Sequence, residues 1–177
     1  SNNPLLTEIE CGGDDNQQIS SIDVSNNTDL YKLYCGGLGL TSLDVSANTN
    51  LHILQCQQNS LTSLDVSANT ALTTLYCDNN QLTTLDVSNN TLLEHFGTQN
   101  NNITSLDVSS NTALIEFRCD VNQLTYLNMR NGVTDQLTTF NATNNSLDCI
   151  DVNAEDVEYA TTNWTNENGS IEDAVTF

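Results

Sequence analysis

Hydrophobic residues recur along this chain in a fixed order that repeats every 21 residues. The phrase Leu-Asp-Val-Ser opens at Leu43, Leu64, Leu85 and Leu106, while Ile22 opens a close variant and Leu127 a decayed one. The next equivalent, Ile150, lies 23 residues further on, with two inserted residues near 131–135. A period this strict predicts a stack of about seven short coils, in which each coil buries the apolar face of its neighbours.

Each unit divides into a strand and a return segment. Residues 51–67 read Leu-x-x-Leu-x-Cys-x-x-Asn-x-Leu-Thr-Ser-Leu-Asp-Val-Ser. The alternation of Leu54 and Cys56 has period two, which predicts a short strand with both side chains pointing inward. Stacked coils would place equivalent strands ~4.8 Å apart in one parallel sheet. The remaining leucines, Leu61 and Leu64, would face the same core from the turn and from the back of the coil.

This unit resembles the leucine-rich-repeat motif, with Cys in place of the third Leu, over residues 6–150. The 21-residue form is similar to repeats of secreted and surface proteins of Gram-negative bacteria, and more distantly to internalins. The resemblance implies an α/β-type solenoid, a right-handed coil stack with one parallel sheet on its concave face and turns or 3-10 pieces on its convex face. We expect an N-terminal coil or cap over 1–21, the solenoid over 22–150 and an irregular cap over 151–177, in one domain excised from a longer chain.

Three polar columns run along the predicted stack. Five of the six cysteines share one inward position, interrupted by Thr98, so we expect buried thiols rather than disulfides or a metal site; these are Cys11, Cys35, Cys56, Cys77 and Cys119. Cys149 lies outside the column. An Asn column follows the strand, where it would bond the backbone of adjacent coils: Asn59, Asn80, Asn101, Asn122 and Asn145. Leu38 interrupts this column among Gly36, Gly37 and Gly39, which predicts an irregular first turn.

Aspartates form the third column, on the back of the coils: Asp23, Asp44, Asp65, Asp86 and Asp107. Stacked carboxylates repel one another unless something offsets their charge. One interpretation is that each Asp accepts backbone N–H bonds and shapes its own tight turn. The alternative is a calcium ladder, which would use Asp44, Asp65, Asp86 and Asp107 as oxygen ligands.

The variable outward positions of the strands form the candidate ligand surface, because a solenoid keeps its scaffold constant and varies its sheet face. The candidate residues are Tyr31, Lys32, Tyr34, His52, Gln55, Tyr76, Asp78, His95 and Arg118. Four of the five Lys, Arg and His residues map to this face. Tyr and Arg are typical interface residues. The alternative is that exposed strand positions simply favour Tyr and tolerate polar side chains.

The charge and the missing motifs narrow the function. Three Lys and Arg against 23 Asp and Glu give a net charge of −20, which disfavours nucleic acid and anionic membranes. No stretch approaches the ~18 apolar residues of a membrane span. No phosphate-binding loop, metal motif or catalytic constellation appears, and neither histidine has an evident carboxylate partner, so we expect no enzyme and no cofactor. Trp164 is expected to plug the C-terminal end of the core.

We therefore expect a monomeric, non-catalytic module that binds a protein, for interaction or adhesion. The resemblance places it outside the cell or on a bacterial cell surface. Tyrosines among Asn, Gln, Asp and Thr also suit a glycan, and a spacer without a ligand is the third alternative.

Overall fold

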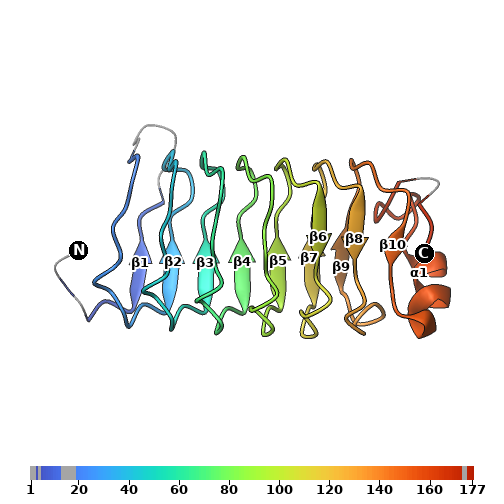
Figure 1. Ribbon diagram of the computed structural model, residues 1–177, viewed down its shortest axis with the longest axis horizontal. Helices are drawn as coiled ribbons and strands as arrows, with labels where there is room; N and C mark the ends of the chain where they lie inside the picture. The colour runs from blue at the N-terminus through green and yellow to red at the C-terminus, as the bar shows by residue number, and fades with distance from the viewer. Residues whose placement is uncertain (1–2, 4, 13–18, 173–174) are drawn as a thin grey trace.

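The coils stand side by side in a single row (Figure 1). This computed structural model describes residues 3, 5–12, 19–172 and 175–177. The predicted N-terminal coil or cap lies only partly within these ranges, since residues 1–2, 4 and 13–18 fall outside them. None of the helices described is long and apolar enough to span a membrane.

The main sheet is parallel and has seven strands, one from each coil, as the repeat predicts. In spatial order they are β1 (Glu8–Glu10), β2 (Lys32–Tyr34), β3 (Ile53–Gln55), β4 (Thr74–Tyr76), β5 (His95–Gly97), β7 (Glu116–Arg118) and β9 (Thr139–Asn141). Equivalent repeat positions pair across the sheet; Leu33 faces Leu54, and Leu54 faces Leu75. The register therefore stacks identical positions into columns that run the length of the molecule.

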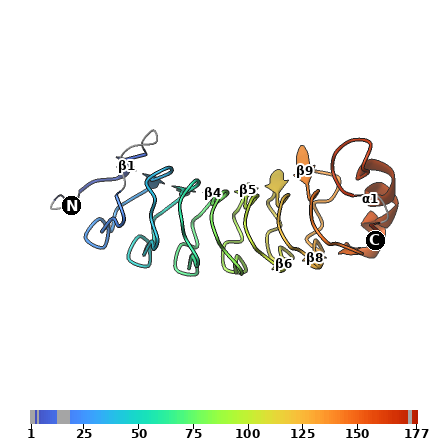
Figure 2. The same cartoon turned by 90° about the horizontal axis from the view of Figure 1, so that it is seen from above.

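The seven-stranded sheet confirms the predicted sheet, but the back of the last coils carries a second parallel sheet where turns or 3-10 pieces were expected. Its strands are β6 (Ser105–Asp107), β8 (Tyr126–Asn128) and β10 (Ile150–Asp151). Figure 2 shows β6 and β8 on the opposite side of the coils from β4, β5 and β9. The Leu-Asp-Val phrase alternates buried and exposed residues, as a strand does. Here the backbones also come within bonding distance, as in Val108 N–H to the Asn128 carbonyl at 2.9 Å.

Aromatic rings close the C-terminal half of the core. The Phe96 and Phe117 rings stack 5.4 Å apart, Phe140 follows at 5.9 Å, and Trp164 lies 4.2 Å from Phe140. Trp164 is only 5% exposed, so it plugs the end of the core as predicted. Around it, η1 (Ala154–Asp156) and α1 (Val157–Asn163) form the helical part of the cap. The Ala142 N–H donates to the Ser170 carbonyl at 2.8 Å, which ties the cap to the last coil.

The predicted asparagine column bonds neighbouring coils as expected. The Asn80 amide group donates to the carbonyls of Cys56 and Cys77, each at 3.0 Å, and its oxygen accepts the Leu61 N–H at 3.0 Å. A second buried column on the back of the coils was not predicted: Asn27, Asn48, Asn69, Asn90 and Asn111. The Asn69 amide, for example, donates to the carbonyls of Val45 and Asn48. The two columns hold the coils together at both ends of the strand segment.

Candidate functional site

The predicted ligand residues gather on what we call the sheet face: the outward side chains of the main sheet and of the residues flanking its strands. They form two clusters. In the first, the rings of Tyr31 and His52 stack with centroids 4.3 Å apart. The Lys32 ammonium pairs with the Glu8 carboxylate at 3.2 Å and lies 5.9 Å from the centre of the Tyr31 ring. This cluster joins β1, β2 and the start of β3.

The second cluster centres on the carboxylate of Glu116, on β7. Arg118 Nε lies 3.1 Å from it and His95 Nδ1 lies 3.5 Å from it. The Tyr76 hydroxyl reaches the same carboxylate at 3.5 Å, although Tyr76 is two strands away on β4. The expectation that neither histidine has a carboxylate partner is thus wrong for His95. Glu116 is not among the candidate residues chosen from the sequence, because its central position depends on which side chains reach across from neighbouring coils.

A glycine explains how Tyr76 spans two coils. The Tyr76 ring lies over Gly97 of β5, which pairs with Tyr76 of β4 on one side and with Arg118 of β7 on the other. A Cβ atom added to Gly97 would lie 2.7 Å from a Tyr76 ring carbon, closer than atoms can pack. Burial is the main cause that raises the pKa of Tyr76, and the Glu116 charge adds to it. Tyr76 is therefore a neutral hydroxyl donor at physiological pH, held in one position.

The turn that follows β7 contains a carboxyl with a raised pKa and a valine in a left-handed conformation. Burial raises the pKa of the Asp120 carboxyl, and the charge of Asp78 adds to this, while Arg118 opposes it. Next to it, Val121 has a φ of +55°, a left-handed conformation that β-branched residues avoid. The equivalent residues in other coils are Gly37, Gln58, Asn79, Asn100 and Asn144. Val121 is also 40% exposed, so its side chain gains little by packing there.

Near the first coils, the sheet face has a hollow of about 310 Å³. It is lined by Tyr34, Gln55, Gln57, Gln58 and the glycines Gly12, Gly36 and Gly37. Two predicted ligand residues, Tyr34 and Gln55, thus share one concavity. The side-chain oxygen of Gln57 is buried without a hydrogen-bond partner among the described residues.

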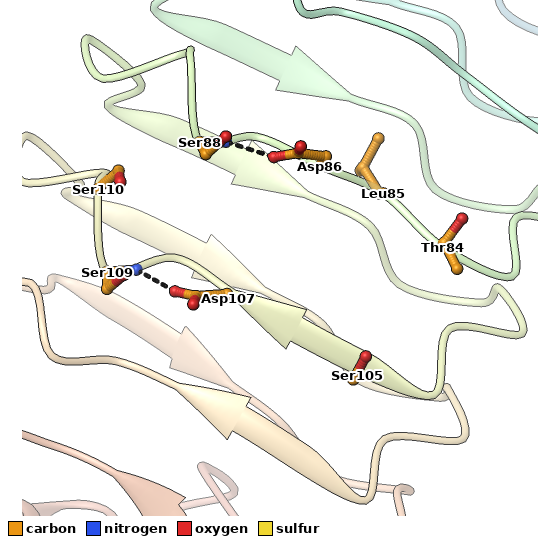
Figure 3. Close-up of a pocket in the computed structure, with 8 residues that line it drawn as sticks. All are labelled: Thr84, Leu85, Asp86, Ser88, Ser105, Asp107, Ser109 and Ser110. Carbon is orange, nitrogen blue, oxygen red and sulfur yellow. Dashed lines mark hydrogen bonds between the residues drawn. The ribbon is translucent and has the colours of Figure 1, made fainter.

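The back of the coils has a larger hollow, about 440 Å³, lined mainly by Ser, Thr and Asp (Figure 3). Its two carboxylates are already used, since Asp86 accepts the Ser88 N–H at 2.9 Å and Asp107 accepts the Ser109 N–H at 2.8 Å. Asp44 and Asp65 bond Ser46 and Ser67 in the same way, which confirms the turn-shaping role. No cluster of three or more His, Cys, Asp or Glu that could hold a metal occurs within the described ranges.

The cysteine column lies inside the coils. Cys35, Cys56, Cys77 and Cys119 are buried free thiols, and Cys11 is half-buried. Burial raises the pKa of Cys35 and Cys77 to about 12 and that of Cys56 and Cys119 well above the usual value. The prediction of buried thiols is confirmed for the four interior positions. Cys149, outside the column, is an exposed free thiol.

Solved structures with the same architecture identify the family. InlJ from Listeria monocytogenes, whose functional domain includes a cysteine ladder, is 37% identical with a TM-score of 0.76; the match covers 85% of this chain and 35% of that one. A leucine-rich-repeat protein of Leptospira interrogans is 24% identical with a TM-score of 0.63, over 72% of this chain and 35% of that one. This chain is a leucine-rich-repeat protein. No model of a protein family matches it, and no curated protein does.

Two facts limit which properties of the similar solved structures can be assigned to this leucine-rich-repeat chain. A structure of the LRIM1/APL1C complex is 23% identical with a TM-score of 0.65, over 76% of this chain and 27% of that one, and at this identity it shows the fold alone. The chain spans about a third of the length of InlJ. InlJ is described as having a cysteine ladder, and this leucine-rich-repeat protein has the cysteine column described above.

Proposed function

We propose that this leucine-rich-repeat protein is a non-catalytic module that binds another protein on its sheet face, outside the cell or on a bacterial cell surface. The observation that carries the proposal is the pair of clusters at Tyr31–His52 and Tyr76–Glu116–Arg118. Their aromatic and Arg side chains are half-exposed and already ordered by neighbours, so less conformational entropy is lost on binding.

The test is a triple variant, Tyr34→Ala, Tyr76→Ala and Arg118→Ala. It should lose capture of surface proteins by the immobilised module, because it removes two contact-making side chains of the second cluster together with Tyr34, which lines the hollow near the first coils. A matched control changes three exposed back-of-coil residues, Ser42→Ala, Ser63→Ala and Thr104→Ala, and should bind as the unmodified protein does. Circular dichroism and urea unfolding show that both variants remain folded. Equal capture by the two variants would overturn the sheet-face assignment.

A glycan is the second candidate, favoured by the hollow beside Tyr34 and Gln55. A Tyr ring can stack on a sugar, and Gln side chains can bond its hydroxyls. A glycan array with the unmodified protein and with Tyr34→Ala plus Gln55→Ala separates this candidate from the first. Array signals that disappear in the variant support a glycan. If neither the array nor protein capture gives a signal, the module is a spacer. Light scattering checks the expected monomer.

A further inference from the structure

The positive charges of this chain are all engaged within it. The sequence has three Lys and Arg residues. Lys32 pairs with Glu8 at 3.2 Å, Arg118 with Glu116 at 3.1 Å and Arg130 with Asp151 at 3.5 Å. The remaining carboxylates greatly outnumber them. Any acid of the sheet face that lacks an ion pair must therefore find its counter-charge in solvent ions or in another molecule.

Four sheet-face acids are in this position. Glu10, Asp78, Glu94 and Asp120 lie on or beside the main strands, and none forms an ion pair among the residues that the structure describes. Asp78 accepts a single side-chain bond, from Asn79 at 2.7 Å. The engaged acids are Glu8 on β1 and Glu116 on β7. The sheet face thus carries both ion-paired carboxylates and carboxylates without an ion pair.

Asp78 and Asp120 form the most specific part of this pattern. Both occupy the second position after the strand, two coils apart, which sets their backbones ~10 Å from one another. Gln99 occupies the same position between them, and its side-chain oxygen is buried without a hydrogen-bond donor among the described residues. Asp78 and Asp120 are therefore two carboxylates on one line of the sheet face, neither of which has an ion pair among the described residues. Two carboxylates spaced in this way fit the N–H groups of Lys or Arg.

Half-burial makes the missing counter-charge costly. Burial removes part of the hydration of the Asp120 carboxylate and raises its pKa. The charge of Arg118, at the end of the same strand, acts in the opposite direction and does not offset this. A carboxylate in such a place is stabilised when a cation arrives. Apolar surface lies close in the sequence on both sides, with Ile115 39% and Val121 40% exposed. Contacts with the aliphatic stems of Lys or Arg would cover it.

We infer that the sheet face binds a basic segment of a partner protein, with a Lys or Arg side chain placed between Asp78 and Asp120. The inference rests on the proposed function and adds the chemistry of the partner to it. Charge complementarity selects this partner over an acidic or neutral protein, because a chain with a net charge of −20 attracts cations from a distance and repels anions.

The experiment uses a synthetic peptide of repeating Arg-Gly-Ser as the probe, with a Glu-Gly-Ser peptide as its opposite. Calorimetry should show that the Arg peptide binds the whole protein more weakly as salt rises, and that the Glu peptide does not bind. Asp78→Asn plus Asp120→Asn should weaken the affinity for the Arg peptide about tenfold. Glu155→Gln plus Glu167→Gln removes the same charge from the exposed cap and should change this affinity less than about twofold.

Each other outcome counts against the inference. Equal weakening by the two double variants would show that the peptide only senses total charge, and absence of binding by the unmodified protein would exclude a basic segment. The triple variant Tyr34→Ala, Tyr76→Ala and Arg118→Ala separates the two claims. If it loses captured proteins while Asp78→Asn plus Asp120→Asn keeps them, the sheet face binds proteins and the basic-partner inference fails alone.

Discussion

The two faces of the coils carry carboxylates in opposite states. On the back, each Asp of the column accepts bonds from the Ser two residues later, and these bonds lower the pKa of Asp44, Asp65 and Asp86. On the sheet face, burial raises the pKa of Asp120, and neither its backbone hydrogen bond nor the charge of Arg118 offsets this. The back carboxylates therefore stabilise the fold, while Asp120 works against it. This difference separates scaffold acids from acids that are available to a ligand.

The largest expected effect is the loss of stability in acid. The lowered folded-state pKa of the back carboxylates means that their stabilisation is present above the unfolded value of about 3.9 and is lost as pH falls through the folded value. Five residues act in the same direction: Asp23, Asp44, Asp65, Asp86 and Asp107. Urea midpoints measured from neutral pH downward should drop steeply below about pH 4.

The control for the acid experiment is a variant with Asp44→Asn, Asp65→Asn and Asp86→Asn. Asn keeps an acceptor oxygen for the Ser N–H but does not titrate, so the midpoints of this variant should depend less on pH. The same steep drop in the variant would mean that other carboxylates cause the acid unfolding, and the contrast between the faces would lose its main consequence.

The left-handed turn after β7 should be improved by the residue that other coils use. Val121→Asn should raise the free energy of unfolding by about 1 kcal/mol, because it relieves a β-branched side chain at a φ of +55°. Asn100→Val, at a φ of +54°, is the reverse change and should lower it by a similar amount. Urea unfolding of both variants measures this. A stabilising Asn100→Val would show that the backbone angle is not the cause.

Removing one back carboxylate tests the scaffold role directly. Asp86→Ala takes away the acceptor for the Ser88 N–H and should lower the free energy of unfolding by about 1 kcal/mol, a usual cost for a lost cap. Asp86→Asn, which keeps the acceptor, should lower it less. Thermal or urea unfolding distinguishes the two, and equal losses would assign the effect to charge instead of bonding.

The smallest expected effect is a gain in stability, in contrast to the losses expected when back carboxylates are removed. Asp120→Asn should raise the free energy of unfolding at neutral pH by roughly half a kcal/mol, a figure discounted for the solvent that still screens this half-exposed group. A raised folded-state pKa favours the folded protein below the unfolded pKa and disfavours it as pH rises through the folded value. The gain should therefore vanish in strong acid. A loss of stability at neutral pH would show that Asp120 has a structural partner.

The scaffold was largely predictable because its columns repeat. The turn asparagines, the cysteine column and the Asp–Ser turns take the positions that the 21-residue period implies, and Trp164 covers the core at the end that a stack of coils leaves open. The second sheet was not predictable, because the Leu-Asp-Val phrase is nearly the same in every coil and only the later coils bring it within bonding distance. The back asparagines were also missed, since their position in the phrase fits a surface turn equally well.

The candidate site was predictable as a list of residues and not as an arrangement. The repeat places Tyr76, His95 and Arg118 on one face, but their common partner, Glu116, depends on side chains that cross from coil to coil. The route that Tyr76 takes depends on the missing side chain of Gly97. Such cross-coil contacts are set by the residues that vary between repeats, and the period carries no information about them.

Because of the cysteine column, it matters whether the chain folds before or after it meets an oxidant. Four thiols are protected by burial in the finished coils, but the unfolded chain exposes six to any oxidant. In an oxidising medium, coil closure competes with the pairing of neighbouring thiols, and a bridge formed first between the wrong coils fixes a wrong register. A chain that folds before it meets an oxidant shields its four interior thiols, whereas a chain that unfolds in an oxidising medium exposes them to bridging.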